Sequence, residues 1–226
     1  MSGRDERESL FVDVSHDVEH GMITYRGLPA PVISTHLSRA ESRKHYGEGT
    51  EFHIGKIEMV ANTGTYLDAP FHRYADGRDL SELPLSSLAD LEGICISAKG
   101  FAPKGIEVSV FSQADFRDKA VLIHTGWSEH WGSEAYFTGH PFLTRASASF
   151  LVEAGARLVG IDSYNIDDTR DLLRPVHSIL LEAGIPIVEH LCRLDELPWM
   201  GFKFFAVPVK VKSFGTFPVR AFAILK

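Results

Sequence analysis

Short apolar segments alternate with short amphipathic helices in the second half of the chain, and this alternation constrains the fold most strongly. The apolar segments that predict buried strands are 92–98, 120–124, 158–162 and 185–189. The helices predicted between strands are 113–116, 145–154 and 175–183. Strands that alternate with helices are typical of α/β folds, so we expect an α/β fold.

The remaining segments have weaker patterns. Further strands are predicted at 10–14, 52–60, 202–211 and 218–225. One turn of helix is predicted at 65–72, where Pro70 limits its length. Residues 15–50 lack clear periodicity, and we expect a strand near 32–35 and a mobile flap over 38–49.

The composition is that of a globular protein, with 44% hydrophobic and 23% charged residues. No internal repeat and no shift in composition divides the chain. We therefore predict one domain over residues 10–226, preceded by a flexible N-terminus at 1–9.

Charge, hydropathy and cysteine content exclude several classes of protein. Lys and Arg total 23 and Asp and Glu total 30, and the resulting net charge of −7 argues against nucleic-acid binding. No segment reaches the roughly 18–20 apolar residues of a membrane span, and the charged start lacks the apolar core of a signal peptide. Cys95 and Cys192 form no CxxC pair. We expect a cytoplasmic protein in which any metal is held by nitrogen and oxygen ligands.

A polar bend between residues 62 and 72 has the sequence NTGTYLDAPFH. Asp68 and His72 are four residues apart, so they would face one centre if the segment were helical. A carboxylate and an imidazole on a rigid turn suit a divalent metal ion. The alternative is that Asp68 caps a turn and His72 is a half-buried histidine with an ordinary hydrogen bond.

A second group of polar residues follows from the topology of the predicted strand–helix–strand unit at 158–189. The helix runs antiparallel to both strands, so its N-terminus lies at the same sheet edge as the carboxyl ends of the strands. Asp162, His177 and Glu189 should therefore all fall on the edge where open α/β sheets hold their sites, and His177 and Glu189 could share a ligand. The alternative is that His177 bonds to a nearby carboxylate and Glu189 is a solvated strand end.

Other chemistries receive less support. Ser163 lacks the G-x-S-x-G elbow of a serine nucleophile, and no glycine-rich nucleotide motif follows a predicted strand. Trp127 and Trp131 could form an aromatic wall of a pocket, although tryptophans are also common in cores and interfaces.

The polar bend resembles the signature H-x-G-T-H-x-D-x-P-x-H of the cyclase family of metal-dependent hydrolases, which includes bacterial kynurenine formamidases and isatin hydrolases. The likeness extends over residues 10–225, from FVDVSH at 11–16 to FPVRA at 217–221. It implies a layered cyclase-like α/β domain of the swivelling β/α/β type, which assembles as a homodimer or homotetramer.

The resemblance also implies roles for individual residues. Asp68 matches an aspartate that bridges two metal ions, and His72 matches a histidine that shuttles protons. His177 and Glu189 match ligands of the second metal ion.

The signature's first two histidines, which hold the first metal ion, are Asn62 and Tyr66 here. Neutral asparagine is a poor zinc ligand, and tyrosine binds a metal well only as the phenolate, against an ordinary pKa of about 10. We therefore expect one divalent ion, Zn²⁺ or Mn²⁺, held by Asp68, His177 and Glu189.

The implied activity is hydrolysis of an amide, formamide, cyclic imide or lactone bond in a small molecule. The metal ion would acidify water, and His72 would carry its proton to the leaving group. Tyr66 or Asn62 would donate a hydrogen bond to the oxyanion. A planar or apolar substrate would be held by Phe71, Trp127 and Trp131.

Two alternatives stay open at this point. The chain is a non-catalytic member of the fold that binds a small ligand or a partner, or it is an enzyme that works without metal through Tyr66 and His72. Metal content and sensitivity to chelators distinguish these possibilities.

Overall fold

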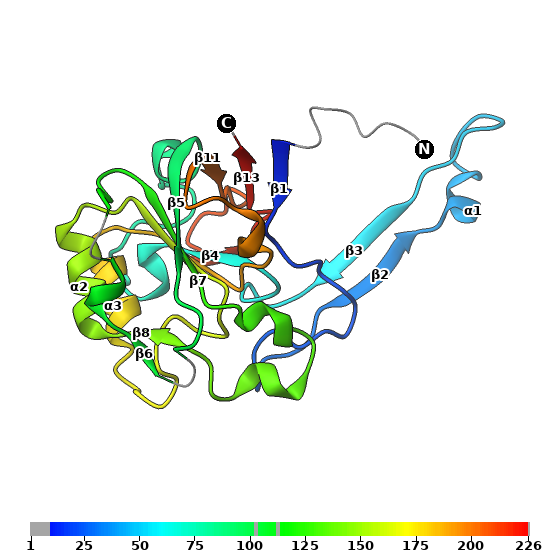
Figure 1. Ribbon diagram of the computed structural model, residues 1–226. Helices are drawn as coiled ribbons and strands as arrows, with labels where there is room; N and C mark the ends of the chain where they lie inside the picture. Colours follow the sequence, from blue (N-terminus) through cyan, green and yellow to red (C-terminus); the bar gives the residue numbers. More distant parts are fainter. Residues whose placement is uncertain (1–9, 102–103, 112–113, 226) are drawn as a thin grey trace, which may run out of the picture.

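The central element of the computed structural model is a curled sheet of nine strands (Figure 1). The structure describes residues 10–101, 104–111 and 114–225. In chain order the strands are β1 (Phe11–Asp13), β4 (Tyr66–Asp68), β5 (Leu91–Ser97), β7 (Ala120–His124), β9 (Leu158–Ile161), β10 (Ile187–Glu189), β11 (Met200–Phe205), β12 (Thr216–Pro218) and β13 (Phe222–Leu225). Their spatial order is β1-β13-β11-β5-β7-β9-β10-β4-β12. The predicted α/β fold is confirmed.

The middle of the sheet is parallel and its two flanks are antiparallel. β5, β7, β9 and β10 pair in parallel, whereas β11 and β4 pair antiparallel with the ends of this group. The parallel strands are almost continuously apolar because both faces of a parallel sheet are covered. Two separate buried clusters form these faces, one around Leu122 and Phe202 and the other around Ile123 and Leu180.

Helices α2 (Arg145–Glu153) and α3 (Pro175–Glu182) pack on one face of the sheet (Figure 1). α2 starts where the hydroxyl of Thr144 accepts the N–H of Ser147 at 3.2 Å. α3 starts with Pro175 and is followed by Gly184 at φ 76°, the usual arrangement of proline at the start and glycine past the end. Both predicted helices are confirmed.

A two-stranded arm projects from the domain (Figure 1). It consists of β2 (Val32–Leu37) and β3 (Ile54–Glu58), with α1 (Arg39–Ser42) at its far end. Most of its side chains are exposed, including Ile33 and Ile57. The segment predicted as a mobile flap therefore carries a short helix, which Ser38 and Glu41 close with a capping box.

Three local predictions differ from the structure. Residues 65–72 contain strand β4 followed by a 3-10 turn, because β10 and β12 supply hydrogen-bond partners on both sides of β4. The predicted strand 202–211 ends at Phe205, and the predicted strand 218–225 is divided between β12 and β13. The predicted helix 113–116 has no helical residue in its described part.

The remaining elements are short. Two-residue strands and 3-10 helices make up this group: β6 (Gly105–Ile106), β8 (Phe142–Leu143), η2 (Pro70–His72), η3 (Leu85–Ser87), η4 (Val108–Phe111), η5 (Trp127–His130), η6 (Glu134–Phe137) and η7 (Leu194–Glu196). The predicted flexible N-terminus at 1–9 lies outside the described residues.

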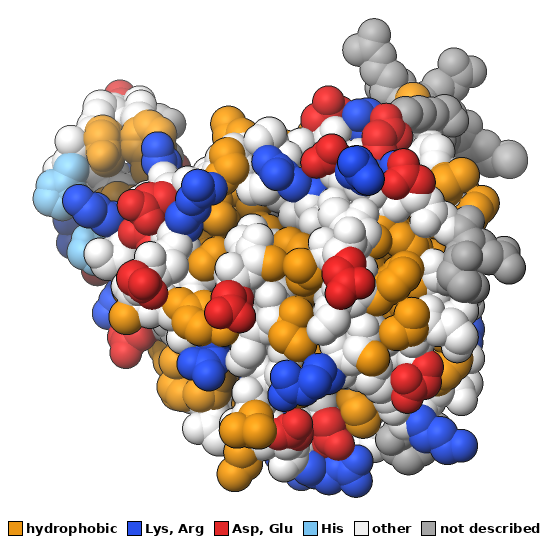
Figure 2. Space-filling view, turned by 90° about the vertical axis from the view of Figure 1, so that its left-hand side faces the viewer, with side chains coloured by type: hydrophobic (Ala, Val, Ile, Leu, Met, Phe, Trp, Pro, Cys, Tyr) orange, Lys and Arg blue, Asp and Glu red, His pale blue; other side chains and the backbone are white. Residues whose placement is uncertain are grey.

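Figure 2 shows acidic and basic side chains interspersed on the face in view, without an extended basic area. Within the described part of the chain, no helix is both long and apolar enough to cross a membrane.

Asp162 secures the loop that follows β7. Its fully buried carboxylate accepts the N–H groups of Thr125 at 2.7 Å and Gly126 at 2.9 Å, as well as the Thr125 hydroxyl at 2.5 Å. Burial raises the pKa of Asp162 even though these three hydrogen bonds oppose the shift. Asp162 directly follows β9, at the strand end predicted for it, and its carboxylate is occupied by the loop.

Replacing Asp162 should therefore affect stability. Asp162→Ala leaves two backbone N–H groups and a hydroxyl without their acceptor, so the free energy of unfolding should fall by about 3 kcal/mol. Urea denaturation followed by circular dichroism measures this change. Exposed Asp76 provides the control, because Asp76→Ala should stay within about 0.5 kcal/mol. Equal effects of the two substitutions would show that the loop does not depend on Asp162.

Candidate metal centre

Strand pairing brings the polar bend to the end of β10. In the antiparallel register, Asp68 lies opposite Ile187 on one side and Thr216 on the other, and Tyr66 lies opposite Glu189. Side chains that face each other across an antiparallel pair are close enough to interact. Three segments that are distant in sequence therefore contribute to one site.

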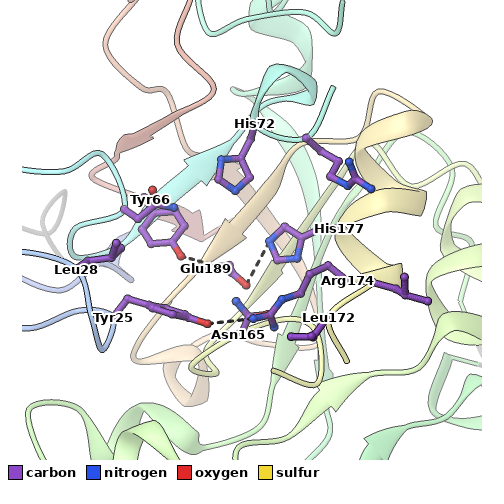
Figure 3. Close-up of a pocket in the computed structure, with 12 residues that line it drawn as sticks. Tyr25, Leu28, Tyr66, His72, Asn165, Leu172, Arg174, His177 and Glu189 are labelled. Atoms are coloured by element: carbon purple, nitrogen blue, oxygen red, sulfur yellow. Dashed lines mark hydrogen bonds and ion pairs between the residues drawn. The ribbon is translucent and has the colours of Figure 1, made fainter. Parts of the chain in front are cut away.

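The predicted ligands His177 and Glu189 face each other in this site (Figure 3), and Asp68 lies beside His177. His177 Nε2 is 3.6 Å from Asp68 Oδ2 and 3.8 Å from Glu189 Oε1. Ligands held by bonds of about 2.0–2.1 Å to a tetrahedral ion are roughly 3.4 Å apart, so these separations are close to those of a metal site. His72 lies close to two of these residues. Ligand atoms of Asp68, His72 and His177 all lie within 4.8 Å of one another.

Asp167 fixes the orientation of His177. Its carboxylate accepts the backbone N–H groups of Val176 at 2.7 Å and His177 at 3.0 Å, and it lies 2.6 Å from His177 Nδ1. A carboxylate can only accept, so Nδ1 carries a proton, and in the neutral ring the lone pair of Nε2 is directed at the site. Carboxylate–histidine pairs of this kind orient metal-binding histidines in many proteins.

The charges in the site favour a bound cation. Oδ2 of Asp68 is completely buried and has no hydrogen-bond partner. Burial lowers the pKa of His177, but the nearby carboxylates of Glu189, Asp167 and Asp68 outweigh this effect and hold the pKa well above its usual value. Surroundings that retain a proton so strongly also favour a metal ion in its place. The residues thus fit a divalent ion with nitrogen and oxygen ligands.

Thr216 connects Asp68 with His72. Although burial raises the pKa of Asp68, the two histidines and Thr216 outweigh burial and lower it, so this carboxylate is ionised. The Thr216 hydroxyl donates its only proton to Asp68 Oδ1. His72 Nδ1 lies 2.8 Å from the same hydroxyl oxygen and must therefore donate to it. In the neutral ring, Nε2 of His72 is left without a proton.

Tyr66 occupies a different environment from that of a metal ligand. Its buried hydroxyl donates to Glu189 Oε2 at 2.7 Å and lies 3.3 Å from His190 Nε2. Burial, together with the charges of Glu189 and Asp68, raises the pKa of Tyr66 well above its usual value. The phenol therefore stays neutral, and Asn62 lies within hydrogen-bond reach of it.

A cavity of about 370 Å³ opens above the centre. Among the predicted site residues, Asn62, Tyr66, His72, His177 and Glu189 line it. Its other lining residues are Tyr25, Leu28, Arg73, Asn165, Leu172, Leu173 and Arg174.

The three predicted substrate contacts lie outside this lining. Phe71 is on the 3-10 turn η2, and its backbone N–H bonds to Arg78 at 3.0 Å. The indole N–H of Trp127 donates to the carbonyl oxygen of Tyr136 at 2.9 Å. The ring of Trp131 stacks on that of His16, with 3.9 Å between the ring centroids.

Several residues of the site were not predicted from the sequence. Thr216 lies opposite Asp68, and Arg174 contacts Tyr25, so both depend on partners far away in the chain. Asp167 lies in the loop before α3 and contacts the first turn of that helix. The one local signal is the position of Arg174 directly before Pro175, at the start of the helix that carries His177.

Comparisons with known proteins agree with the geometry. A model of the family described as "Putative cyclase" matches residues 12–168. The chain belongs to this family. A kynurenine formamidase from Bacillus cereus is 27% identical over 225 residues, which cover 95% of this chain and 97% of that protein.

Solved structures share the fold. Isatin hydrolase A from Ralstonia solanacearum superposes with a TM-score of 0.81 at 19% identity, over 96% of this chain and 92% of that one. A structure described as a predicted metal-dependent hydrolase from Bacillus stearothermophilus has a TM-score of 0.71 at 25% identity, over 96% and 98% of the two chains. The relatives are thus hydrolases, and the cluster of Asp68, His72 and His177 suggests a divalent metal ion.

The support that Asp167 gives to His177 can be tested directly. Asp167→Asn should weaken Mn²⁺ binding by about 10–100-fold, because His177 loses the acceptor that sets its tautomer and orientation. Calorimetric titration of the metal-free protein measures the affinity. Asp168→Asn is the matched control, since Asp168 pairs with exposed Arg170. Unchanged affinity in Asp167→Asn would mean that His177 needs no such support.

Proposed function

We propose that the protein is an amidohydrolase that uses one divalent ion, Zn²⁺ or Mn²⁺, to cleave an amide, formamide, cyclic imide or lactone bond in a small molecule. The observation that carries this proposal is that Asp68 Oδ2 is buried without a hydrogen-bond partner, 3.6 Å from His177 Nε2. Asp68, His177 and Glu189 would hold the ion. When bound, the ion supplies a Lewis acid and acidifies a water molecule.

A single ion suits the site better than a pair. Histidines at the positions of Asn62 and Tyr66 would be needed for a first ion of the family type. Here the Tyr66 hydroxyl is neutral and donates to Glu189. This hydrogen bond holds Glu189 in place, so Tyr66 supports the ligand set without joining it.

We assign the proton transfers to His72. Its Nδ1 donates to Thr216, so its unprotonated Nε2 can accept a proton from water and return it to the leaving nitrogen or oxygen. The imidazole is about one-third exposed, with 36% of the side chain accessible, which lets it meet a substrate in the cavity. The predicted oxyanion donors are Asn62 and Tyr66. Because Tyr66 uses its proton on Glu189, the Asn62 amide is the better placed of the two.

The arm supports the predicted homodimer or homotetramer. Isolated two-stranded hairpins are marginally stable in water. In this hairpin, four large apolar residues have exposed fractions of 39–51%: Val32, Ile33, Ile54 and Ile57. A second copy of the chain that covers these side chains would explain their exposure.

A substrate panel tests the proposed activity. Metal-loaded protein should hydrolyse at least one member of a panel of aryl formamides, cyclic imides and lactones, and a chelator should remove that activity. Activity that survives the chelator would favour catalysis by Tyr66 and His72 without metal. A protein that binds Mn²⁺ but hydrolyses no member would favour the alternative of a non-catalytic, ligand-binding protein.

A further inference from the structure

Arg174 places a positive charge on the wall of the cavity beside the candidate metal centre. It lies three residues before His177, and residues at this spacing lie on the same side of a helix start. Figure 3 shows Arg174 on this wall together with Tyr25, Asn165, His177 and Glu189. A substrate that reaches the metal ligands therefore passes close to the guanidinium.

The partners of this guanidinium are neutral. Its Nη2 lies 3.2 Å from the Tyr25 hydroxyl and its Nη1 lies 3.4 Å from Asn165 Oδ1. In the described part of the chain no ion pair involves Arg174. Several other arginines do have carboxylate partners: Arg26, Arg39, Arg43, Arg170, Arg193 and Arg220. Arg174 thus keeps an uncompensated charge and unused donors.

The rest of the lining indicates what kind of molecule would carry the matching charge. Leu28, Leu172 and Leu173 line the same cavity, and the last two are 88% and 71% exposed. Leucines that exposed at the rim of a cavity favour an apolar or aromatic body in the ligand. The planar fork of a guanidinium matches a carboxylate with two parallel hydrogen bonds.

We propose that Arg174 forms an anion subsite that selects substrates carrying a carboxylate on an apolar or aromatic body. This inference rests on the proposed hydrolase function of the same cavity. Tyr25 and Asn165 hold the guanidinium in place without neutralising it, so its charge is available to the carboxylate. Arg174 binds the carboxylate of the substrate, and the amide carbonyl of the substrate then faces Asp68, His177 and Glu189.

Hydrolysis of two matched formamides tests the selectivity. 2-Formamidobenzoate and formanilide differ only in the carboxylate. In Arg174→Met, the ratio of kcat/KM for 2-formamidobenzoate to that for formanilide should fall by about 10–100-fold, as expected for a charged hydrogen-bonded pair. Arg174→Lys keeps the charge but loses the fork, so its ratio should lie between those of the wild type and Arg174→Met. Arg170→Met is the control, because Arg170 lies outside this cavity.

Binding of product analogues tests the same subsite without turnover. Metal-free protein is titrated with 2-aminobenzoate and with aniline, so that a bound metal cannot itself attract the carboxylate. Arg174→Met should lower the affinity for 2-aminobenzoate at least about tenfold. The affinity for aniline and the thermal stability of the protein should stay unchanged. Equal losses for both probes would show that Arg174 only ties down Tyr25, and no loss would also overturn the proposal. If the loaded wild type hydrolyses neither formamide, the formamidase activity fails, while the binding comparison still decides the role of Arg174.

Discussion

Asp68→Asn should remove metal binding and lower kcat/KM at least about a thousandfold, because a bound ion supplies several kcal/mol of transition-state stabilisation. The substitution keeps the size of the side chain and the hydrogen bond from Thr216, but it removes the charge of the unpartnered Oδ2. Circular dichroism of the metal-free proteins checks that the variant still folds.

Metal content by plasma mass spectrometry and turnover on the panel substrate measure both effects of Asp68→Asn. Asp79→Asn is the matched control: Asp79 is also buried, and its carboxylate accepts hydrogen bonds from Ser81 and Ser213 outside the cavity. This control should keep its metal and its activity. An Asp68→Asn variant that retains both would remove Asp68 from the ligand set.

His72→Ala should lower kcat by about 10²–10⁴-fold, the usual contribution of a general acid–base. Its affinity for Mn²⁺ should change little, because Asp68, His177 and Glu189 remain. The two measurements separate a role in proton transfer from a role in metal binding. The geometry allows both roles, because a ring nitrogen of His72 lies within 4.8 Å of the ligand atoms of Asp68 and His177.

Added imidazole should restore part of the activity of His72→Ala, because the missing ring leaves space beside Thr216. His45→Ala on the exposed tip of the arm is the control and should behave like the wild type. Loss of Mn²⁺ binding in His72→Ala would make His72 a ligand. Unchanged kcat would remove it from catalysis.

The central strands and the helices on their face could be predicted because their signals are local. Segments 120–123 and 158–161 are continuously apolar, and α3 carries proline at its start and glycine after its end. The topology of the strand–helix–strand unit at 158–189 was enough to predict that His177 and Glu189 lie close together. In the structure, His177 Nε2 is 3.8 Å from Glu189 Oε1.

Other parts of the site depend on pairings that no local pattern contains. Leu67 pairs with Val188 and Phe217, which are more than a hundred residues away, so the strand around it was predicted as a turn of helix. Asp162 was predicted only as the end of a strand, because the loop after β7, whose N–H groups donate to its carboxylate, is distant in the sequence. Thr216 gave no signal of its own, because its importance comes from Asp68, which lies opposite it.

We propose that one divalent ion at Asp68, His177 and Glu189 makes this chain a hydrolase. The most direct test is to add Mn²⁺ stepwise to the metal-free protein while following hydrolysis of the best panel substrate. Activity should start near zero, rise linearly and level off at about one equivalent of metal per chain. Full activity before any metal is added, or a plateau only after about two equivalents, would contradict the claim.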